Sequence, residues 1–451
     1  MPTENPDQPD LYGESQPYPE MLHARGIALK VLDLVLTRRT PLDQVLEENT
    51  DLMELPVRDR AFVRMIVATT LRRMGQIDDL IVKASDGKPA PQPPMLHHLL
   101  RMGVAQLMFM NVPDHAAVNT AVQLAENVGL GRGKGFVNAI LRRLGREGRG
   151  WLEAQDEARA NVPEWLLKEW INDYGLGEAA EIAQASLAEA PLDITIKDPA
   201  KMDYWAEVLQ ATPLPGGSLR RISGGNVQDL PGYHDGMWWV QDASATLPAR
   251  LFGDLHETEV VDLCAAPGGK TAQLAAAGAS VIALDRSITR IKRLDENMRR
   301  LRLDKTVHTE AADGTVWQPR VPVPAVLLDA PCSATGTIRR HPDVLRLKRP
   351  DDIVRLCEMQ SRMLDNACDM LLPGGMLIYC TCSLQKAEGE RQIESFLKRN
   401  PVMKRKPIAA AEIGHLENAI TPQGDVRILP WHLAAHGGMD GFYIARMVKE
   451  S

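Results

Sequence analysis

Four of the six cysteines lie where short apolar segments end, and such segments are typical of buried strands. The four are Cys264, Cys332, Cys380 and Cys382. A single cysteine is usually a small buried apolar residue, and we expect this of Cys357 and Cys368, which share one helical face. Thiols that converge beside a ligand site indicate covalent catalysis, because the thiolate is a strong nucleophile. No second cysteine pair at metal-ligand spacing accompanies Cys380 and Cys382, which argues against a zinc site.

A glycine-containing turn follows the first of these apolar segments. Residues 262–271 are Asp-Leu-Cys-Ala-Ala-Pro-Gly-Gly-Lys-Thr. Gly268 and Gly269 would let the backbone approach a ligand at the N-terminus of the next helix. The spacing matches neither the Walker phosphate-binding loop nor the dinucleotide fingerprint. Two glycines alone are typical of an ordinary turn, so a ligand prediction needs further support.

That support comes from acidic residues at the ends of successive strand-like segments. They are Asp262, Asp285, Asp313 and Asp329. The carboxyl ends of parallel strands form one edge of a sheet, where ligands bind, and an acid at the second strand end can accept hydrogen bonds from ribose hydroxyls. One such aspartate is usually a turn residue, but four in succession favour a nucleoside ligand.

The elements that would position these residues begin at about residue 241. From there, strand-like and helical segments alternate, which predicts a doubly wound, mainly parallel α/β sheet over residues 241–451. The strand-like segments are 259–263, 280–284, 306–310, 325–329, 376–381 and 442–447.

The chain before residue 241 has a different texture. Residues 21–150 show helical periodicity with almost no strand signal, which predicts an all-α bundle. Its helices are expected at 57–74, 77–84, 94–110, 114–128 and 134–146, and Thr40 and Pro41 are expected to begin another as N-cap and first-turn proline. Residues 57–74 are expected to place Phe62, Met65 and Ile66 on one apolar face. Residues 151–240 predict linker helices and a small α+β module, in which we find no chemistry. Residues 1–20, with five prolines and five acidic side chains, predict a disordered tail.

Length and composition are those of a soluble multidomain protein. A chain of 451 residues suggests about three domains. No apolar run reaches the ~20 residues of a membrane helix, and the few cysteines suggest reduced thiols and a cytoplasmic location. The net charge of −7 argues mildly against nucleic acid as a partner, but five of these negative charges fall in residues 1–20, and the basic residues are clustered.

Three of these segments resemble a known family. The segments DLCAAPGGKT at 262–271, DAPCSATGTIRRHPD at 329–343 and YCTCS at 379–383 are similar to motifs of the Sun family of S-adenosylmethionine-dependent RNA cytosine-5 methyltransferases. The helical region, with RDRAFVRMIVATTLRRM at 58–74 and GFVNAILRRL at 135–144, resembles the NusB-like RNA-binding domain of its bacterial members. The segments VPEWLLKEWINDYG at 162–175 and WVQDASA at 239–245 resemble the family's linking module.

The resemblance extends over about residues 22–447 and has one departure. The linking module has Ile-Thr-Ile-Lys at 194–197, where the family usually has Leu-Arg-Val-Asn. This departure concerns RNA contacts of the linking module and leaves the catalytic motifs intact.

The resemblance implies a Rossmann-like methyltransferase domain with S-adenosylmethionine as cofactor. The residues implied to wrap the methionine and ribose parts of the cofactor are Cys264, Ala265, Ala266, Pro267, Gly268, Gly269 and Lys270. Asp285 is implied to bind the ribose hydroxyls, and Asp313 to lie near the adenine. Asp329 is implied to lie between the cofactor and the target base.

The resemblance also assigns roles to the thiols. It implies that Cys382 is the nucleophile and that Cys332 assists release of the product, whereas Cys380 is expected to be structural. Carbon-5 of cytosine is a poor nucleophile, and a thiolate that adds at carbon-6 turns the ring into an enamine able to take the methyl group. A base must then remove the carbon-5 proton before the thiolate can leave.

RNA binding requires local positive charge. Arg339 and Arg340 follow the Cys332 segment, and we expect them to contact phosphate. The basic residues of 286–305 are undecided between RNA contacts and an ordinary solvated helix face. The NusB-like region favours small-subunit ribosomal RNA as the partner, and we expect a monomer with no metal and no membrane association.

Three other functions were weighed. A DNA cytosine-5 methyltransferase would use the Pro-Cys thiol as nucleophile and carry a downstream Glu-Asn-Val, whereas the tripeptide at 126–128 lies upstream of the cofactor loop. A non-catalytic NusB-like protein would have lost a motif residue, and none is missing. A transfer RNA substrate for the same chemistry stays open.

Overall fold

The computed structural model describes residues 18–222 and 225–450, and most of the acidic tail expected at residues 1–20 lies outside them. The chain divides into two compact units. The helical unit extends to Pro163 and includes His341–Leu347. The second unit comprises Glu164–Arg340 and continues from Lys348, and we call it the catalytic unit because it contains the residues predicted to be catalytic. The small module expected at 151–240 therefore belongs, from Glu164 on, to the same unit as the α/β sheet predicted at 241–451.

The helical unit contains helices throughout its described part, as predicted. They are α1 (Tyr18–Leu36), α2 (Leu42–Glu48), α3 (Thr50–Glu54), α4 (Val57–Arg72), α5 (Met74–Ala84), α6 (Pro94–Phe109), α7 (Asp114–Asn127), α8 (Lys134–Glu153), α9 (Glu157–Asn161) and α16 (Val344–Leu347). The N-cap of α2 is Pro41, not Thr40 as expected, and it makes no side-chain cap. The unit continues beyond the boundary expected at 150, because α8 extends to Glu153 and α9 follows it.

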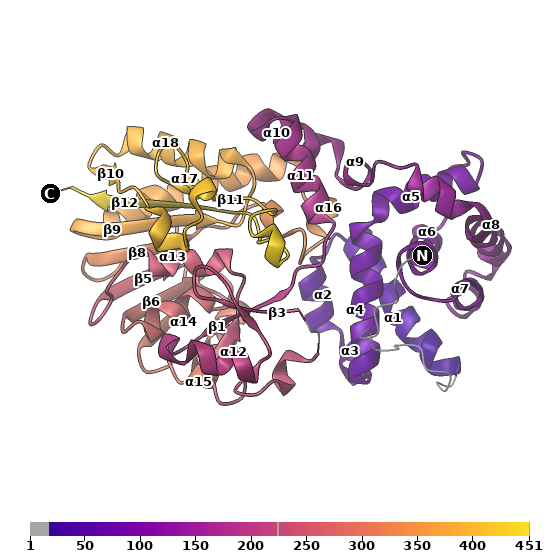
Figure 1. Ribbon diagram of the computed structural model, residues 1–451, viewed down its shortest axis with the longest axis horizontal. Helices are drawn as coiled ribbons and strands as arrows, with labels where there is room; N and C mark the ends of the chain where they lie inside the picture. Colours follow the sequence, from indigo (N-terminus) through magenta and orange to yellow (C-terminus); the bar gives the residue numbers. More distant parts are fainter. Residues whose placement is uncertain (1–17, 223–224, 451) are drawn as a thin grey trace. The chain divides into compact units, whose positions relative to one another are not determined.

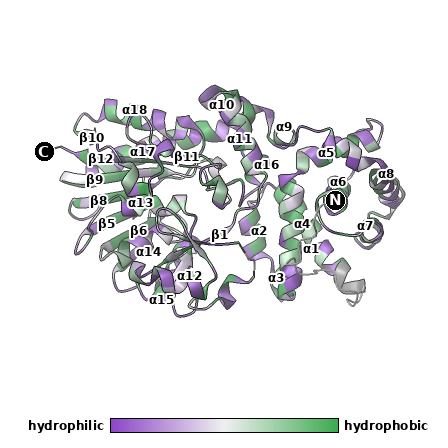
Figure 2. Ribbon diagram, in the orientation of Figure 1, coloured by the Kyte–Doolittle hydropathy of each residue, from purple (hydrophilic) through white to green (hydrophobic). Residues whose placement is uncertain are grey.

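Helix α4 shows how periodicity places the core of this unit. Its fully buried apolar residues are Val63, Ile66, Val67 and Leu71, and Figure 2 shows hydrophobic residues along its length. The buried face of α4 differs from the predicted face of Phe62, Met65 and Ile66. Ile66 is buried, but Phe62 and Met65 are only half-buried. Phe62 lies instead under the guanidinium of Arg25, 4.7 Å from its ring centroid.

A short segment from far along the chain completes the helical unit. The Asp343 carboxylate accepts a hydrogen bond from the backbone N–H of Leu42 at 3.0 Å, at the start of α2. Arg346 donates to the carbonyl oxygen of Asn161, and Arg39 donates to that of Leu347. The first N–H group of α2 is thus satisfied by a carboxylate that is distant in sequence.

The linking module of the catalytic unit combines helices with a small antiparallel sheet. Its elements are α10 (Glu164–Tyr174), α11 (Leu176–Ser186), β1 (Leu192–Ile196), α12 (Met202–Val208), β2 (Thr212–Pro213), β3 (Leu219–Arg221) and β4 (Trp238–Val240). The strand order is β2-β3-β1-β4. Ile194, Leu219 and Trp238 form its apolar centre.

The main sheet contains eight strands, and its central part is parallel as predicted. The strands are β5 (Glu259–Leu263), β6 (Ser280–Asp285), β7 (Val307–Ala311), β8 (Val323–Asp329), β9 (Leu371–Thr381), β10 (Met403–Arg405), β11 (Val426–Ile428) and β12 (Phe442–Lys449). The order is β10-β12-β9-β8-β5-β6-β7, and β11 pairs with β12. Strand β12 runs antiparallel to β9, and the short strands β10 and β11 were not predicted. Figure 1 shows most of these strands in this order.

Helices cover both faces of this sheet, which explains its continuous apolar strands. Val260 packs into one core with residues of α13 (Leu247–Arg250), α14 (Gly269–Ala276) and α15 (Ile288–Leu301). Its neighbour Val261 packs into another core with residues of α17 (Pro350–Met370) and α18 (Glu390–Arg399). Alternate residues of one strand therefore serve opposite faces.

A buried ion pair joins the linking module to the rest of the catalytic unit. Arg220 donates to both carboxylate oxygens of Asp193 at 2.7 and 2.6 Å, and the two side chains are 2% and 0% exposed. Asp193 also accepts from the N–H of Ala243, and Arg220 donates to the carbonyl oxygens of His436 and Gly438.

We predict that Asp193→Ala lowers the free energy of unfolding of the catalytic unit by about 3–5 kcal/mol, because it leaves the Arg220 guanidinium buried without its counter-ion. Urea denaturation measures this change. The exposed Asp235→Ala is the control, expected to change stability by less than about 0.5 kcal/mol. Equal stabilities of the two variants would contradict a structural role for the pair.

Candidate active site at the carboxyl edge of the sheet

Two of the predicted catalytic cysteines lie in direct contact. The Sγ atoms of Cys332 and Cys382 are 3.5 Å apart. Strands β8 and β9 pair in parallel with Asp329 opposite Cys380, so the loops that follow leave the sheet side by side. The loops are joined where the N–H of Gly336 donates to the carbonyl oxygen of Cys382 at 2.9 Å. The structure thus brings together two thiols that are 50 residues apart in sequence.

Asp329 is the centre of a charged cluster beside this pair. Its Oδ2 accepts from Nζ of Lys270 at 2.7 Å, and Cys380 donates from its Sγ to Oδ1 at 3.5 Å. The Lys270 side chain is 11% exposed and lies 5.1 Å from the ring centroid of Phe442. Burial opposes the charge on Lys270, but the Asp329 carboxylate and the neighbouring thiols outweigh burial and raise its pKa. Lys270 therefore keeps a positive charge at this edge of the sheet.

The glycine-containing turn has the backbone geometry expected of a ligand loop. Cys264 has φ of +62°, and Gly268 has φ of +105°. A Cβ at Gly268 would lie 3.1 Å from Cε of Met298 and 3.2 Å from Cγ of Leu294. A Cβ at Gly269 would make only ordinary contacts with Gln241, the nearest at 3.4 Å. The position that requires glycine is therefore Gly268.

A buried acid under this turn lacks a full set of partners. Asp262 is 0% exposed, and its Oδ2 accepts from Oγ1 of Thr271 at 2.6 Å. Its Oδ1 is buried and has no hydrogen-bond partner. Burial, together with the charges of Asp329 and Asp285, raises the pKa of Asp262 to about 7. An unsatisfied buried carboxylate oxygen fits a ligand that brings hydrogen-bond donors.

The other two predicted cofactor acids lie at neighbouring strand ends. Asp285 ends β6 with Oδ1 accepting from the N–H of Ser287 at 3.0 Å and Oδ2 at 2.9 Å from the Arg290 guanidinium. Arg290 also donates to the carbonyl oxygen of Ala266, which ties the turn to β6. Asp313 is exposed beyond the end of β7, and hydrogen bonds from the backbone and hydroxyl of Thr315 lower its pKa. The donors and acids present fit a nucleoside ligand that carries a charged amino acid group.

The thiols differ in their surroundings. Burial raises the pKa of Cys264 and of Cys380. The pKa of Cys332 is raised by its contact with Cys382, by burial and by the charge of Glu388. Cys380 is 0% exposed, as expected of a structural cysteine.

Arg339 and Arg340 do not have the surroundings expected of phosphate contacts. Arg339 is 2% exposed and donates to the carbonyl oxygen of Gly437. Arg340 donates to Asp242 at 2.6 Å and to Asp440 at 2.8 Å. Two arginines that follow a catalytic motif look like RNA ligands in the sequence, but burial and these partners commit their guanidinium groups to the fold.

Sequence reasoning missed the polar residues beneath the two cysteine loops. Ser333, Ser383 and the buried Glu388 form a hydrogen-bonded cluster directly behind the thiols. Only one signal could have indicated it, namely that a serine follows each of the two cysteines predicted to be catalytic. Glu388 could not be placed from the sequence, because its position depends on the conformation of the loop after β9.

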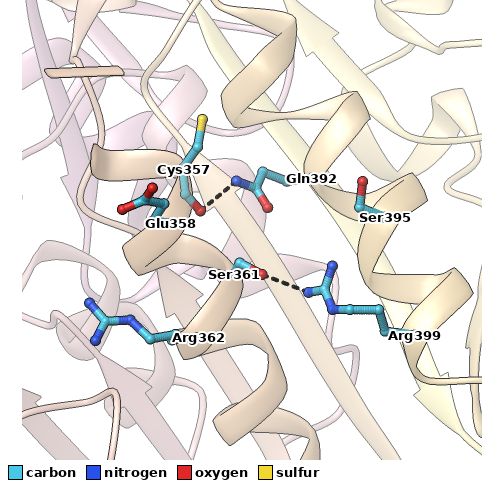
Figure 3. Close-up of a pocket in the computed structure, with 7 residues that line it drawn as sticks. All are labelled: Cys357, Glu358, Ser361, Arg362, Gln392, Ser395 and Arg399. Atoms are coloured by element: carbon cyan, nitrogen blue, oxygen red, sulfur yellow. Dashed lines mark hydrogen bonds between the residues drawn. The ribbon is translucent and has the colours of Figure 1, made fainter. Parts of the chain in front are cut away.

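A hollow between α17 and α18 is separate from this cluster (Figure 3). It is lined in part by Cys357, Ser361 and Arg399, and Arg399 donates to Oγ of Ser361 at 2.7 Å. The Sγ of Cys357 donates to the carbonyl oxygen of Ala387. Cys357 is only partly buried and is not the buried apolar residue that was expected, whereas Cys368 is buried as expected.

Within 18–222 and 225–450, no group of three or more His, Cys, Asp or Glu side chains is arranged to hold a metal ion. No helix in the same part of the chain is both long and apolar enough to span a membrane.

Each of the two units contains a segment that matches a known protein family. Residues 22–146 match the NusB family, and residues 251–448 match the family described as 16S rRNA methyltransferase RsmB/F. The chain is 36% identical over 406 residues to ribosomal RNA small subunit methyltransferase B of Xanthomonas campestris, covering 87% of this chain and 90% of that protein. It is 35% identical over 409 residues to the protein of the same name from Vibrio cholerae, covering 87% and 90%.

Solved structures show the same fold. The crystal structure of PH0851 has a TM-score of 0.75 and 22% identity, covering 97% of this chain and 99% of that one. The structure of NSun6 from Pyrococcus horikoshii has a TM-score of 0.52 and 19% identity, covering 64% and 98%. The sequence relatives cover most of this chain, and both family matches agree with the observed fold. The chain therefore belongs to the family of ribosomal RNA small subunit methyltransferase B, with a NusB-family domain and an RsmB/F methyltransferase domain.

Proposed function

We propose that this protein transfers a methyl group from S-adenosylmethionine to carbon-5 of a cytosine in small-subunit ribosomal RNA, through a covalent adduct between Cys382 and carbon-6 of the base. The observation that carries the proposal is the 3.5 Å contact between Cys332 and Cys382 beside the Lys270–Asp329 ion pair. Nucleophilic catalysis explains the pair of thiols better than direct methyl transfer does, because direct transfer needs no thiol. The names of the relatives support the RNA substrate.

The residues around the first turn fit the cofactor, which supplies the methyl group when it is bound. Cys264 to Lys270 would wrap it, Asp262 offers an unsatisfied buried oxygen, and Asp285 and Asp313 extend the acidic edge along the strand ends. The Lys270 ammonium balances the Asp329 carboxylate, so this edge is not uniformly negative.

The thiols and Asp329 would then act on the base. The Cys382 thiolate would add to carbon-6, and Asp329 would accept hydrogen bonds from the amino group and from a protonated ring nitrogen, which takes up the charge displaced by the thiolate. Carbon-5 of the resulting enamine would then take the methyl group. Cys332 would assist removal of the carbon-5 proton, after which the Cys382 thiolate leaves. The cytosine must be turned out of any stack, which single-stranded RNA permits at low cost.

A first prediction separates the two thiols. Cys382→Ala should neither methylate RNA nor form a covalent complex, because the attacking atom is gone. In Cys332→Ala, Cys382 should still add to the base and carbon-5 should still take the methyl group, but the carbon-5 proton should be removed slowly. A denaturant-resistant protein–RNA complex that carries labelled methyl should therefore accumulate. Gel electrophoresis with labelled cofactor measures both. A complex with Cys382→Ala and none with Cys332→Ala would reverse the two roles.

A second prediction concerns the cofactor loop. Gly268→Val should weaken S-adenosylmethionine binding by about 5- to 150-fold, because a β-branched residue at φ of +105° costs about 1–3 kcal/mol and crowds Met298 and Leu294. Titration calorimetry on folded protein measures the affinity. Gly177→Ala, in open space, is the control. Unchanged affinity of the valine variant would count against placing the cofactor at this turn.

A third prediction assigns RNA affinity to the helical unit. Arg142, Arg146 and Arg149 are exposed and lie at positions i, i+4 and i+7 of α8, which places them along one face of the helix. Replacing the three by glutamine should weaken binding of ribosomal RNA and reduce the slope of log affinity against log salt by about 2–3, since each phosphate contact contributes nearly one. Cofactor affinity should stay the same. An unchanged salt dependence would remove this face from the interface.

Bisulfite sequencing of ribosomal and transfer RNA from cells that lack the protein tests the substrate. Loss of one methylated cytosine in small-subunit ribosomal RNA supports the proposal. Loss of methylated cytosine in transfer RNA alone would support the proposed chemistry but contradict the proposed substrate.

A further inference from the structure

The two thiols of the site lie close enough to be joined by a covalent bond. The Sγ atoms of Cys332 and Cys382 are 3.5 Å apart, and both cysteines are free thiols in the structure. The two sulfurs of a disulfide are about 2.05 Å apart, so the gap would have to close by about 1.5 Å. Two side chains can share a movement of this size.

Backbone hydrogen bonds hold the two loops together on both sides of Cys332. The N–H of Ala330 donates to the carbonyl oxygen of Cys380 at 2.9 Å. The N–H of Gly336 donates to the carbonyl oxygen of Cys382, also at 2.9 Å. Because Cys332 lies between these two ties, the folded chain keeps its thiol near that of Cys382.

The serine that follows each cysteine adds a third tie. The hydroxyl oxygens of Ser333 and Ser383 are 3.0 Å apart, and both hydroxyls donate to Oε2 of Glu388 at 2.5 Å. All three side chains are buried. A buried polar network whose members are hydrogen-bonded to one another makes the local structure rigid. The contact between the sulfurs is therefore built by the chain's own hydrogen bonds.

Exposure and partners separate this pair from other cysteines. Cys332 and Cys382 are both partly exposed, so a small oxidant can reach them. Cys380 is 0% exposed. Cys357 is partly exposed as well, but the partner of its Sγ is the carbonyl oxygen of Ala387. The structure thus combines access for an oxidant with a second thiol in contact at the catalytic pair.

We propose that Cys332 and Cys382 form an oxidative modification site, at which a hydroperoxide joins them as a disulfide that stops methyl transfer until a dithiol reduces it. The peroxide takes two electrons from one sulfur as its O–O bond breaks and an S–O bond forms, which gives a sulfenic acid and water. The second sulfur then attacks the first, so that the S–S bond forms and the S–O bond breaks. The oxygen leaves as water with the proton of the second thiol. The same disulfide results whichever sulfur is oxidised first.

The loss of methyl transfer rests on the proposed function, whereas the disulfide rests on the geometry of the loops. In the disulfide, no thiolate is available to add to carbon-6, and no thiol is available to assist removal of the carbon-5 proton. One modification would therefore remove both proposed catalytic groups, and reduction would return both.

The test treats the full-length protein with hydrogen peroxide, without RNA or cofactor. The remaining thiols are blocked with iodoacetamide, and linked peptides are identified by mass spectrometry without reduction. We expect the link between Cys332 and Cys382 to be the main product, and RNA methylation to fall in proportion to the linked fraction. Dithiothreitol should restore both the thiols and the methylation. Absence of this link, or links to Cys264 or Cys380 in equal yield, would overturn the proposal.

Single-cysteine variants show whether each thiol protects the other. In Cys332→Ala, peroxide should carry Cys382 on to the sulfinic acid, which dithiothreitol does not reverse. Cys382→Ala, which leaves Cys380 in place, should abolish the link and expose Cys332 to the same oxidation. The matched control Cys357→Ala removes a partly exposed cysteine outside the pair and should keep the link and its reversal. A product at Cys382 that dithiothreitol reverses in Cys332→Ala would contradict the proposal.

Unfolded protein shows whether the fold directs the link. Protein unfolded in urea before the peroxide is added should form links that also involve the other cysteines, because 50 residues separate Cys332 from Cys382. The same distribution of links in folded and unfolded protein would overturn the proposal. A selective, reversible link that leaves methylation intact would instead uphold the disulfide and overturn the proposed roles of the two cysteines in catalysis.

Discussion

The parallel pairing of β8 with β9 is the constraint on which the site depends. Because Asp329 lies opposite Cys380, the loops that leave these strands start at the same level of the sheet. Each loop then carries its cysteine a few residues beyond the strand end, and the two sulfurs meet at 3.5 Å. A shift of register by two residues would move one loop by about 6–7 Å along the strand and separate the thiols.

The buried charged groups near β8 and β9 have two different roles. The Asp193–Arg220 pair and the partners of Arg340 tie the linking module and the loop after Cys332 to the chain near residue 440. These groups hold the backbone, and they are almost fully buried except for Arg340, whose side chain is 22% exposed. Lys270, Asp329 and Glu388 instead lie near the thiols, where the Asp329 carboxylate raises the pKa of Lys270 and the Glu388 charge contributes to the raised pKa of Cys332.

The loop after Cys332 also supplies a segment of the helical unit. Residues 341–347 follow Arg340 directly, and Asp343 satisfies the first N–H of α2. Asp343 is 5% exposed and burial raises its pKa, so this cap is an integral part of the helical core and not a surface contact. Residues adjacent in the motif DAPCSATGTIRRHPD therefore serve different parts of the fold.

The amino-acid sequence by itself determined the elements and the motifs, because local periodicity and turn chemistry are encoded within short segments. Helices α4 to α8, the central parallel strands and the positions of Cys332, Cys382 and the acidic strand ends were all predictable in this way. The short strands β10 and β11 were not, since their pairing with β12 is a tertiary contact. Tertiary structure alone decided that Arg339 and Arg340 are committed to internal partners, that Gly268 and not Gly269 requires glycine, and that Glu388 lies behind both cysteines. Each of these depends on burial and on partners that are distant in sequence, and burial decides whether a charged side chain binds a ligand or holds the fold together.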